Sequence, residues 1–174
     1  MTTGTLTDSS RRIARARLLE ERCFEILGAW VATCTDPEVK LCFARQSHHH
    51  AWHAELFGRV LTDANGFEPA SAEPDPTVAE FLDVLASASG PVDRLAGMFE
   101  LWVPRTVATY ERWLDGVDPV REAPLARWLT FVVSDEKADL AEGRALLAAR
   151  SSGGATPGRA ALDAAFAGLA DLLD

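Results

Sequence analysis

The sequence has no apolar run long enough to cross a membrane. No window approaches the roughly 18 apolar residues that a membrane-spanning helix needs, and the first residues do not combine a basic flank with an apolar run. Positive charge is also scarce, because 17 Lys and Arg stand against 26 Asp and Glu and the net charge is −9. These shortages disfavour a membrane or a nucleic acid as a partner, and they predict a cytoplasmic protein.

Cysteine is scarce as well. Cys23, Cys34 and Cys42 are odd in number and have no CxxC spacing. This pattern fits a reducing compartment better than a disulfide framework, and it is poorly spaced for a thiolate zinc site. Cys23 and Cys42 fall on apolar helix faces, where we expect small buried side chains.

No segment shows the period-two alternation of a strand, whereas long stretches carry apolar residues at helical spacing. The chain is therefore predicted to be all-α. Amphipathic helices bury their apolar stripes by packing together, so we expect a four-helix bundle. The four long helices are predicted over residues 8–34, 36–62, 91–115 and 124–150.

The connection over residues 65–90 is long enough to cross the bundle from one end to the other, and it carries a short helix over 77–88. Residues 1–150 are predicted to form the bundle domain. Residues 151–174 contain a flexible break, which includes Gly153-Gly154, and a C-terminal helix that packs on the bundle or on a partner subunit. A homodimer is the assembly that this helix suggests.

The third long helix contains Pro104 near its middle. Proline has no N–H group and clashes with the preceding turn, so we expect a kink or a lost hydrogen bond there. Glu100 and Glu111 face outward on a straight helix. This helix therefore offers no clear buried acid.

All four histidines lie between His48 and His53, inside the second predicted helix. At 100° per residue, Gln46, His49, His50 and His53 fall within the apolar stripe and His48 falls outside it. Histidines three or four residues apart on one face could close on one metal ion or one substrate proton. The plain alternative is a buried histidine that only forms a hydrogen bond to a neighbouring helix.

Acids also fall inside apolar stripes. Glu20 lies in the stripe of the first helix; Glu136 and Asp139 lie in that of the fourth, with Asp135 and Glu142 at its margin. A buried carboxylate is costly unless it is paired or bound to a metal. Carboxylates and imidazoles around one interior space form an oxygen and nitrogen ligand set that suits iron or manganese, with zinc as an alternative.

This pattern resembles the ferritin-like family of carboxylate-bridged di-iron proteins. That family has one Glu on helix 1, Glu-x-x-His on helix 2, one Glu on helix 3 and Glu-x-x-His on helix 4. Glu20 matches the first position. Gln46-x-x-His49 and Glu136-x-x-Asp139 match the second and fourth motifs with one substitution each, and His50-x-x-His53 is an alternative register for the second.

The resemblance implies a non-haem metalloenzyme of the oxidase or oxygenase type that acts on a small organic substrate. The third position falls near Thr106 or Tyr110 and has no acid, so one metal ion, two or none are the alternatives. The implied metal ligands are Glu20, His49, His50, His53, Glu136 and Asp139. The implied catalytic residues are Glu20, His53, Tyr110 and Glu136. Gln46 is expected beside the ligands, where it would hold them in place. Residues expected to shape the surrounding pocket, with plain core packing as the alternative, are Trp52, Trp102, Tyr110, Trp113 and Trp128.

Two other functions are consistent with the same residues. Glu20 or Glu136 could act with His53 as general acid and base in an isomerisation, cyclisation or elimination without a metal. In a non-catalytic bundle, the polar cluster would be a hydrogen-bond network that sets the helix register, and the C-terminal helix would be a binding surface.

Overall fold

The computed structural model describes residues 6–61, 72–151 and 157–173. All regular structure in these ranges is helical, as predicted, and none of the described helices could span a membrane. The elements in chain order are α1 (Leu6–Thr33), α2 (Pro37–Val60), α3 (Pro76–Ala86), α4 (Pro91–Ala96), the π-helical turn η2 (Gly97–Trp102), α5 (Val103–Gly116), α6 (Ala123–Arg150) and α7 (Pro157–Ala167).

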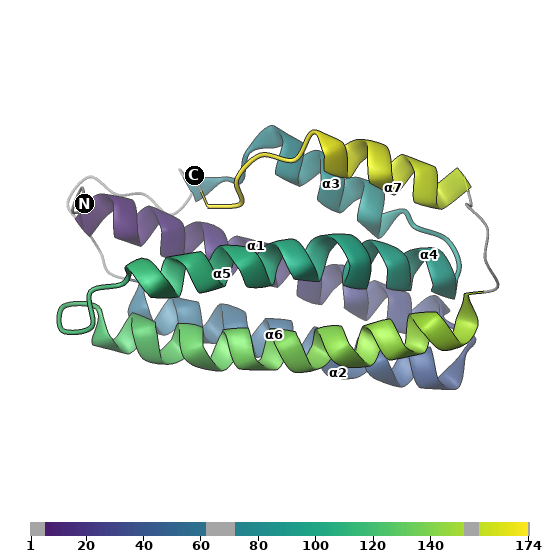
Figure 1. The fold of residues 1–174 in the computed structure, drawn as a ribbon, viewed down its shortest axis with the longest axis horizontal. Coiled ribbons are helices and arrows are strands. Elements are labelled where there is room, and N and C mark those ends of the chain that lie inside the picture. The colour runs from purple at the N-terminus through teal and green to yellow at the C-terminus, as the bar shows by residue number, and fades with distance from the viewer. Residues whose placement is uncertain (1–5, 62–71, 152–156, 174) are drawn as a thin grey trace.

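Four long rods lie side by side in a helical bundle: α1, α2, the continuous rod α4–η2–α5, and α6 (Figure 1). The helices α2 and α5 run in the same direction in Figure 1, because the chain returns along α3 to the opposite end before α4 begins. The predicted crossover is therefore present. The helices α3 and α7 pack against each other on one side of the bundle, with the rings of Phe81 and Phe166 5.7 Å apart.

The start of α2 is set by the local sequence, as predicted. The Asp36 side chain accepts hydrogen bonds from the backbone N–H groups of Glu38 and Val39, at 3.0 and 3.1 Å, and Pro37 occupies the first turn. Arg150, at the end of α6, also pairs with Asp36 at 2.7 Å. The start of the predicted connection over 65–90 and most of the predicted break after residue 151 lie outside the described residues, and the two-part domain division stays a prediction.

The predicted disturbance at Pro104 takes the form of the π-helical turn just before it. The Val103 N–H bonds to the carbonyl of Met98, five residues earlier. In the same pattern the carbonyl of Phe99 would accept from residue 104, which as proline has no N–H group. Arg144 Nε on α6 donates to the Phe99 carbonyl instead, at 3.2 Å. The missing hydrogen bond on one helix is thus replaced by a contact between two helices.

Candidate metal centre

Three helices bring four polar side chains together inside the bundle. Glu20 comes from α1, His50 and His53 from successive turns of α2, and Glu136 from α6. Each residue is at most 2% exposed, and one ligand atom from each lies within 4.8 Å of the other three. We call these four residues the quartet. The quartet could hold a metal ion.

The facing atoms of the quartet lie close to one another. Glu20 Oε2 lies 2.6 Å from His50 Nδ1 and 3.3 Å from His53 Nδ1. Glu136 Oε1 lies 3.4 Å from each of the same two nitrogens. Four ligands at about 2.0–2.1 Å from one ion in a tetrahedron are about 3.3–3.4 Å apart. Three of the separations have this value, and the fourth is shorter.

Glu136 is the quartet member whose polar atoms are least satisfied. Both of its carboxylate oxygens are buried, and neither accepts a hydrogen bond of acceptable geometry within the described part of the chain. Its 3.4 Å contacts with the two imidazoles are close enough for ion pairing but are poorly oriented for hydrogen bonds. A buried carboxylate in this position needs a positive partner.

The charges within the quartet depend on one another. Burial alone would raise the pKa of Glu20 and lower the pKa of His50 and His53. The opposite charges nearby outweigh burial, so the pKa of Glu20 lies below its usual range and the pKa values of His50 and His53 are raised. A raised histidine pKa means that protons compete more strongly with a metal ion for the imidazole nitrogens.

Tyr110 is the contribution of α5 to this centre. Its hydroxyl is fully buried and donates a hydrogen bond of 2.7 Å to Glu20 Oε1. Burial, together with the charge of Glu20, raises the pKa of Tyr110 well above its usual value, so the phenol stays a donor. Thr106, the other residue near the expected third position, bonds to the Trp102 carbonyl of its own rod. The third helix thus supplies a donor to Glu20 where the resemblance would place a carboxylate.

The prediction that His49 and Asp139 join the other ligands is not matched by the structure. His49 Nδ1 lies 2.8 Å from Asp139 Oδ2, and the two form a separate pair beside the quartet. The reason is angular: His49 is turned about 100° from His50 on the helix, so both cannot face one point. Of the two predicted registers of the second motif, His50-x-x-His53 is the one whose histidines belong to the quartet. Gln46 instead donates to Cys42 Sγ at 3.1 Å and to the Asp139 carbonyl at 3.4 Å.

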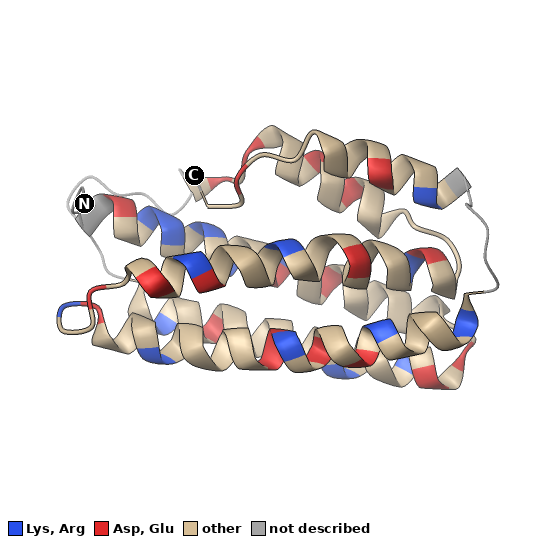
Figure 2. Ribbon diagram, in the orientation of Figure 1, with Lys and Arg blue, Asp and Glu red and all other residues tan. Residues whose placement is uncertain are grey.

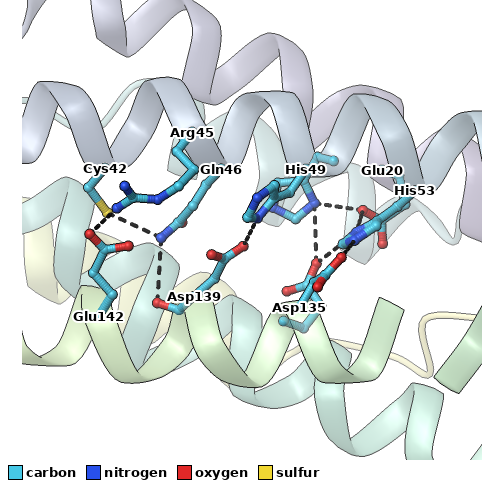
Figure 3. Close-up of polar contacts among 11 residues, drawn as sticks. Glu20, Cys42, Arg45, Gln46, His49, His53, Asp135, Asp139 and Glu142 are labelled. Atoms are coloured by element: carbon cyan, nitrogen blue, oxygen red, sulfur yellow. Dashed lines mark hydrogen bonds and ion pairs between the residues drawn. The ribbon is translucent and has the colours of Figure 1, made fainter. Parts of the chain in front are cut away.

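Asp135 has a contact that the sequence alone did not assign. Its Oδ2 lies 3.3 Å from His53 Nε2, on the ring edge opposite the nitrogen that faces Glu20 (Figure 3). A carboxylate at Nε2 holds the proton there and leaves Nδ1 free to bind a metal. The available signal was the position of Asp135 four residues before Asp139, at the margin of the same stripe.

The tryptophans predicted to shape a pocket are dispersed. Trp52 is exposed, with the guanidinium of Arg59 5.4 Å from its ring centre. Trp102 stacks on Phe81, and Trp113 stacks on Phe57. Trp128 is half-buried on α6. They serve mainly as packing residues, and only Trp113 lines a described pocket.

Two pockets are described, and no member of the quartet lines either of them. The smaller, of about 150 Å³, lies near the basic N-terminal half of α1 (blue in Figure 2), and its floor includes Trp113, whose ring centre is 6.4 Å from that of Tyr110. The larger, of about 490 Å³, lies on the outer surface between α1 and α2. The lining residues of the smaller pocket are Arg12, Thr109, Arg112, Trp113, Asp171 and Leu173.

Comparison of the chain with protein-family models, curated proteins and solved structures finds no match in any of the three. Fold and site together define an all-α helical bundle with a buried cluster of two glutamates and two histidines that could bind a metal ion.

Proposed function

We propose that this chain is a metalloprotein whose quartet binds one divalent ion of iron or manganese. The observation that carries the proposal is the state of Glu136, whose two buried oxygens lack hydrogen-bond donors while Oε1 lies 3.4 Å from two imidazole nitrogens. A buried carboxylate whose oxygens lack a well-oriented partner is costly. A divalent ion would supply that partner.

Charge balance supports the same proposal. Two carboxylates and two neutral imidazoles with one divalent ion have no net charge, which is the least costly state for a site at most 2% exposed. The ligand atoms are oxygen and nitrogen, which suit iron, manganese or zinc better than soft metals. Cys23 lies one turn from Glu20 on α1, but burial raises the pKa of its thiol well above the usual value and keeps it protonated.

The arrangement of helices supports a ferritin-like bundle with a single ion. Parallel α2 and α5, joined through a crossover, are typical of that class (Figure 1). The ligands come from α1, α2 and α6, whereas α5 contributes only the donor Tyr110. A dinuclear site of the ferritin type uses four carboxylates, so two carboxylates favour one ion.

We further propose that the function is oxidative and that the substrate is a small organic molecule. A bound iron or manganese ion supplies redox chemistry that amino-acid side chains lack. Tyr110 fixes the orientation of Glu20 through its 2.7 Å hydrogen bond and holds a proton there. The pocket beside Trp113 offers a small molecule a place near Tyr110.

Metal analysis of protein purified without chelator, and then loaded with Fe²⁺, Mn²⁺ or Zn²⁺, tests the first part. We expect about one ion per chain in the natural protein and less than about a tenth of that in Glu136→Gln or His53→Gln variants. Glu111→Gln is the matched control, because Glu111 is an exposed acid paired with Lys137. Failure of the natural protein to bind any of the three ions would refute the proposal.

Oxygen consumption tests the second part. Protein loaded with Fe²⁺ should consume dioxygen faster than the same concentration of free Fe²⁺, and Tyr110→Phe should change that rate while the bound metal stays at about one ion per chain. Equal rates with and without protein would leave a metal-binding protein and remove the oxidative role.

A structural metal is the second candidate, and full enclosure of the quartet favours it. Four protein ligands with no described pocket lined by them are typical of a site that stabilises a fold. In that case chelation should lower the melting temperature while no redox activity follows metal loading. The oxygen experiment separates the two roles.

A further inference from the structure

The interface between α2 and α6 contains a continuous row of polar pairs, which we call the seam. The two helices are antiparallel (Figure 1), so successive residues of α2 meet residues of α6 in reverse order. From one end to the quartet, the pairs are Asp36 with Arg150 at 2.7 Å, Arg45 with Glu142, His49 with Asp139 at 2.8 Å, and His53 with Asp135 at 3.3 Å.

The two inner pairs of the seam differ in chemistry from the two outer ones. The outer pairs are ordinary arginine–carboxylate ion pairs, whereas the inner pairs join an imidazole to a carboxylate, both of which bind transition metals. Figure 3 shows the inner pairs on adjacent turns, facing each other across the seam. The change from arginine to histidine occurs on the turns nearest the quartet.

Each inner pair joins a partly exposed side chain to a buried one. The side chain of Asp135 is 43% exposed and that of His49 30% exposed, whereas Asp139 is 7% exposed and His53 is fully buried. His53 belongs to both regions, because its Nε2 faces Asp135 while its Nδ1 faces Glu20. One imidazole ring therefore lies between a carboxylate in contact with water and the enclosed quartet.

A buried oxygen without a partner lies on the same side of the seam. Gln46 is fully buried and points toward α6, where its amide nitrogen donates to the Asp139 carbonyl (Figure 3). Its Oε1 accepts no hydrogen bond from the described residues. An amide oxygen of this kind is a ligand for a hard cation. Because the amide nitrogen of the same side chain bonds to the Asp139 carbonyl, this oxygen lies near the backbone of Asp139, where a cation beside His49 and Asp139 would give it a partner.

The other polar neighbour of the quartet offers no route to water. Tyr110 is fully buried, and its ring packs against those of Phe57 and Trp113. Among the described hydrogen bonds and ion pairs of the quartet, only the contact with Asp135 involves a substantially exposed side chain. The seam is thus the polar connection between the quartet and the surface.

We propose that the inner seam is the loading route of the metal centre: His49, Asp139 and Asp135 first bind a hydrated divalent transition-metal ion, which then passes to the quartet by way of His53. The imidazoles favour ions such as Fe²⁺, Mn²⁺ or Zn²⁺ over Ca²⁺ and Mg²⁺. This role rests on the proposed metal binding at the quartet, and it assigns a separate, transient site to residues that the quartet does not include.

Stopped-flow mixing of the metal-free protein with Co²⁺ tests the route, because Co²⁺ bound to nitrogen and oxygen ligands absorbs visible light. The rate of Co²⁺ uptake should fall about tenfold or more in a His49→Gln/Asp139→Asn double variant, as loss of a local cation-attracting site predicts. Release to a chelator should slow by a similar factor, because the ion leaves by the same route. Asp135→Asn should slow both steps as a single variant.

Glu111→Gln is the matched control, since it also removes one negative charge, from an exposed acid that pairs with Lys137 and belongs to neither the seam nor the quartet. It should take up Co²⁺ at the natural rate. Uptake by the seam variants at the natural rate, with one ion bound per chain, would overturn the route and leave the metal centre standing. Loss of bound Co²⁺ at equilibrium in the seam variants would also overturn the route, because these residues would then be permanent ligands. Absence of Co²⁺ binding in the natural protein would instead refute the metal centre.

Discussion

The two buried sides of α2 are packed by different means. On the side toward α1, small groups allow a close approach: Ser47 Oγ donates a 3.0 Å hydrogen bond to the Phe24 carbonyl, and a Cβ on Gly28 would lie 3.4 Å from Ser47 Oγ. On the side toward α6, Gln46 and His49 meet the polar groups of the seam. Adjacent residues of one helix thus serve two kinds of interface.

This difference shows which interface is optimised for stability. Toward α1, apart from the contacts of His50 and His53 with Glu20, the Ser47 hydroxyl is satisfied by the Phe24 carbonyl, and shape determines the fit. Toward α6, Glu136 and Gln46 both keep buried oxygens without hydrogen-bond partners among the described residues. Apolar residues of similar size would stabilise that interface better. The proposed metal binding would account for these polar groups.

The largest expected effect comes from replacing Glu136, at the centre of the polar interface between α2 and α6, with an apolar residue. Glu136→Leu should abolish metal binding and raise the free energy of unfolding of the metal-free protein by about 1–3 kcal/mol, because it removes a buried carboxylate whose oxygens accept no hydrogen bond from the described residues. Urea unfolding in the presence of a chelator measures the second effect. A variant less stable than the metal-free natural protein would show that Glu136 is already well satisfied by the imidazoles.

The second prediction concerns pH. Because the pKa values of His50 and His53 are raised, metal binding must displace protons, and affinity should rise about tenfold per pH unit for each proton displaced. The metal-free fold should show the opposite trend. A raised histidine pKa stabilises it below pH about 6.5, and this contribution is lost as the pH rises through the raised values. Competition titrations from pH 6 to 8 check the first trend, and a pH-independent affinity would contradict it.

A matched pair of substitutions compares the two sides of α2 directly. Ser47→Leu places a large group against Gly28 and should lower the free energy of unfolding by about 1–3 kcal/mol through overpacking. Gln46→Leu, one residue earlier, removes the unsatisfied Oε1 and should leave stability within about 1 kcal/mol of the natural protein. Chemical denaturation of both metal-free variants gives the comparison. Equal destabilisation would mean that the two interfaces are packed alike.

The smallest expected effect is at the outer end of the seam. The hydrogen bond from Arg150 and the backbone N–H groups of α2 lower the pKa of Asp36 to about 2. A lowered pKa contributes stability above pH about 4 that is lost as the pH falls toward 2. Asp36→Asn keeps the helix cap but not the charge. As the pH falls from about 4 to about 2, the melting temperature of this variant should therefore fall less than that of the natural protein. Parallel curves of melting temperature against pH for the two proteins would show that the Asp36–Arg150 pair contributes nothing measurable to stability.

The sequence alone was a good guide to the helices because their boundaries depend on local chemistry. Asp36-Pro37 caps α2 and Pro91 opens α4, within the ranges predicted from the same residues. The burial of Glu20 and Glu136 also followed from local information, since each lies within an apolar stripe. Pro104 indicated a disturbance in its rod, although the form that the disturbance took depended on Arg144 from another helix.

The composition of the centre was less predictable. Sequence reasoning offered two histidine registers, included His49 and Asp139 among the ligands, and gave Asp135 no role. A helical wheel gives directions relative to one helix axis, but the rotation of each helix about its axis depends on its neighbours. Gly143 illustrates this dependence, because a Cβ there would lie 2.2 Å from the ring of Phe99, so only glycine lets α6 approach the third rod this closely.

The sequence by itself determined that the chain is helical, where its helices begin and which faces carry acids and imidazoles, because capping and periodicity act within a few residues. Only the tertiary structure decided that His50 and His53, rather than His49, meet Glu20 and Glu136. The physical reason is that successive residues point about 100° apart around the helix axis, so a shift of one residue turns a side chain from one neighbouring helix to another. That rotation is set by packing among all the rods together.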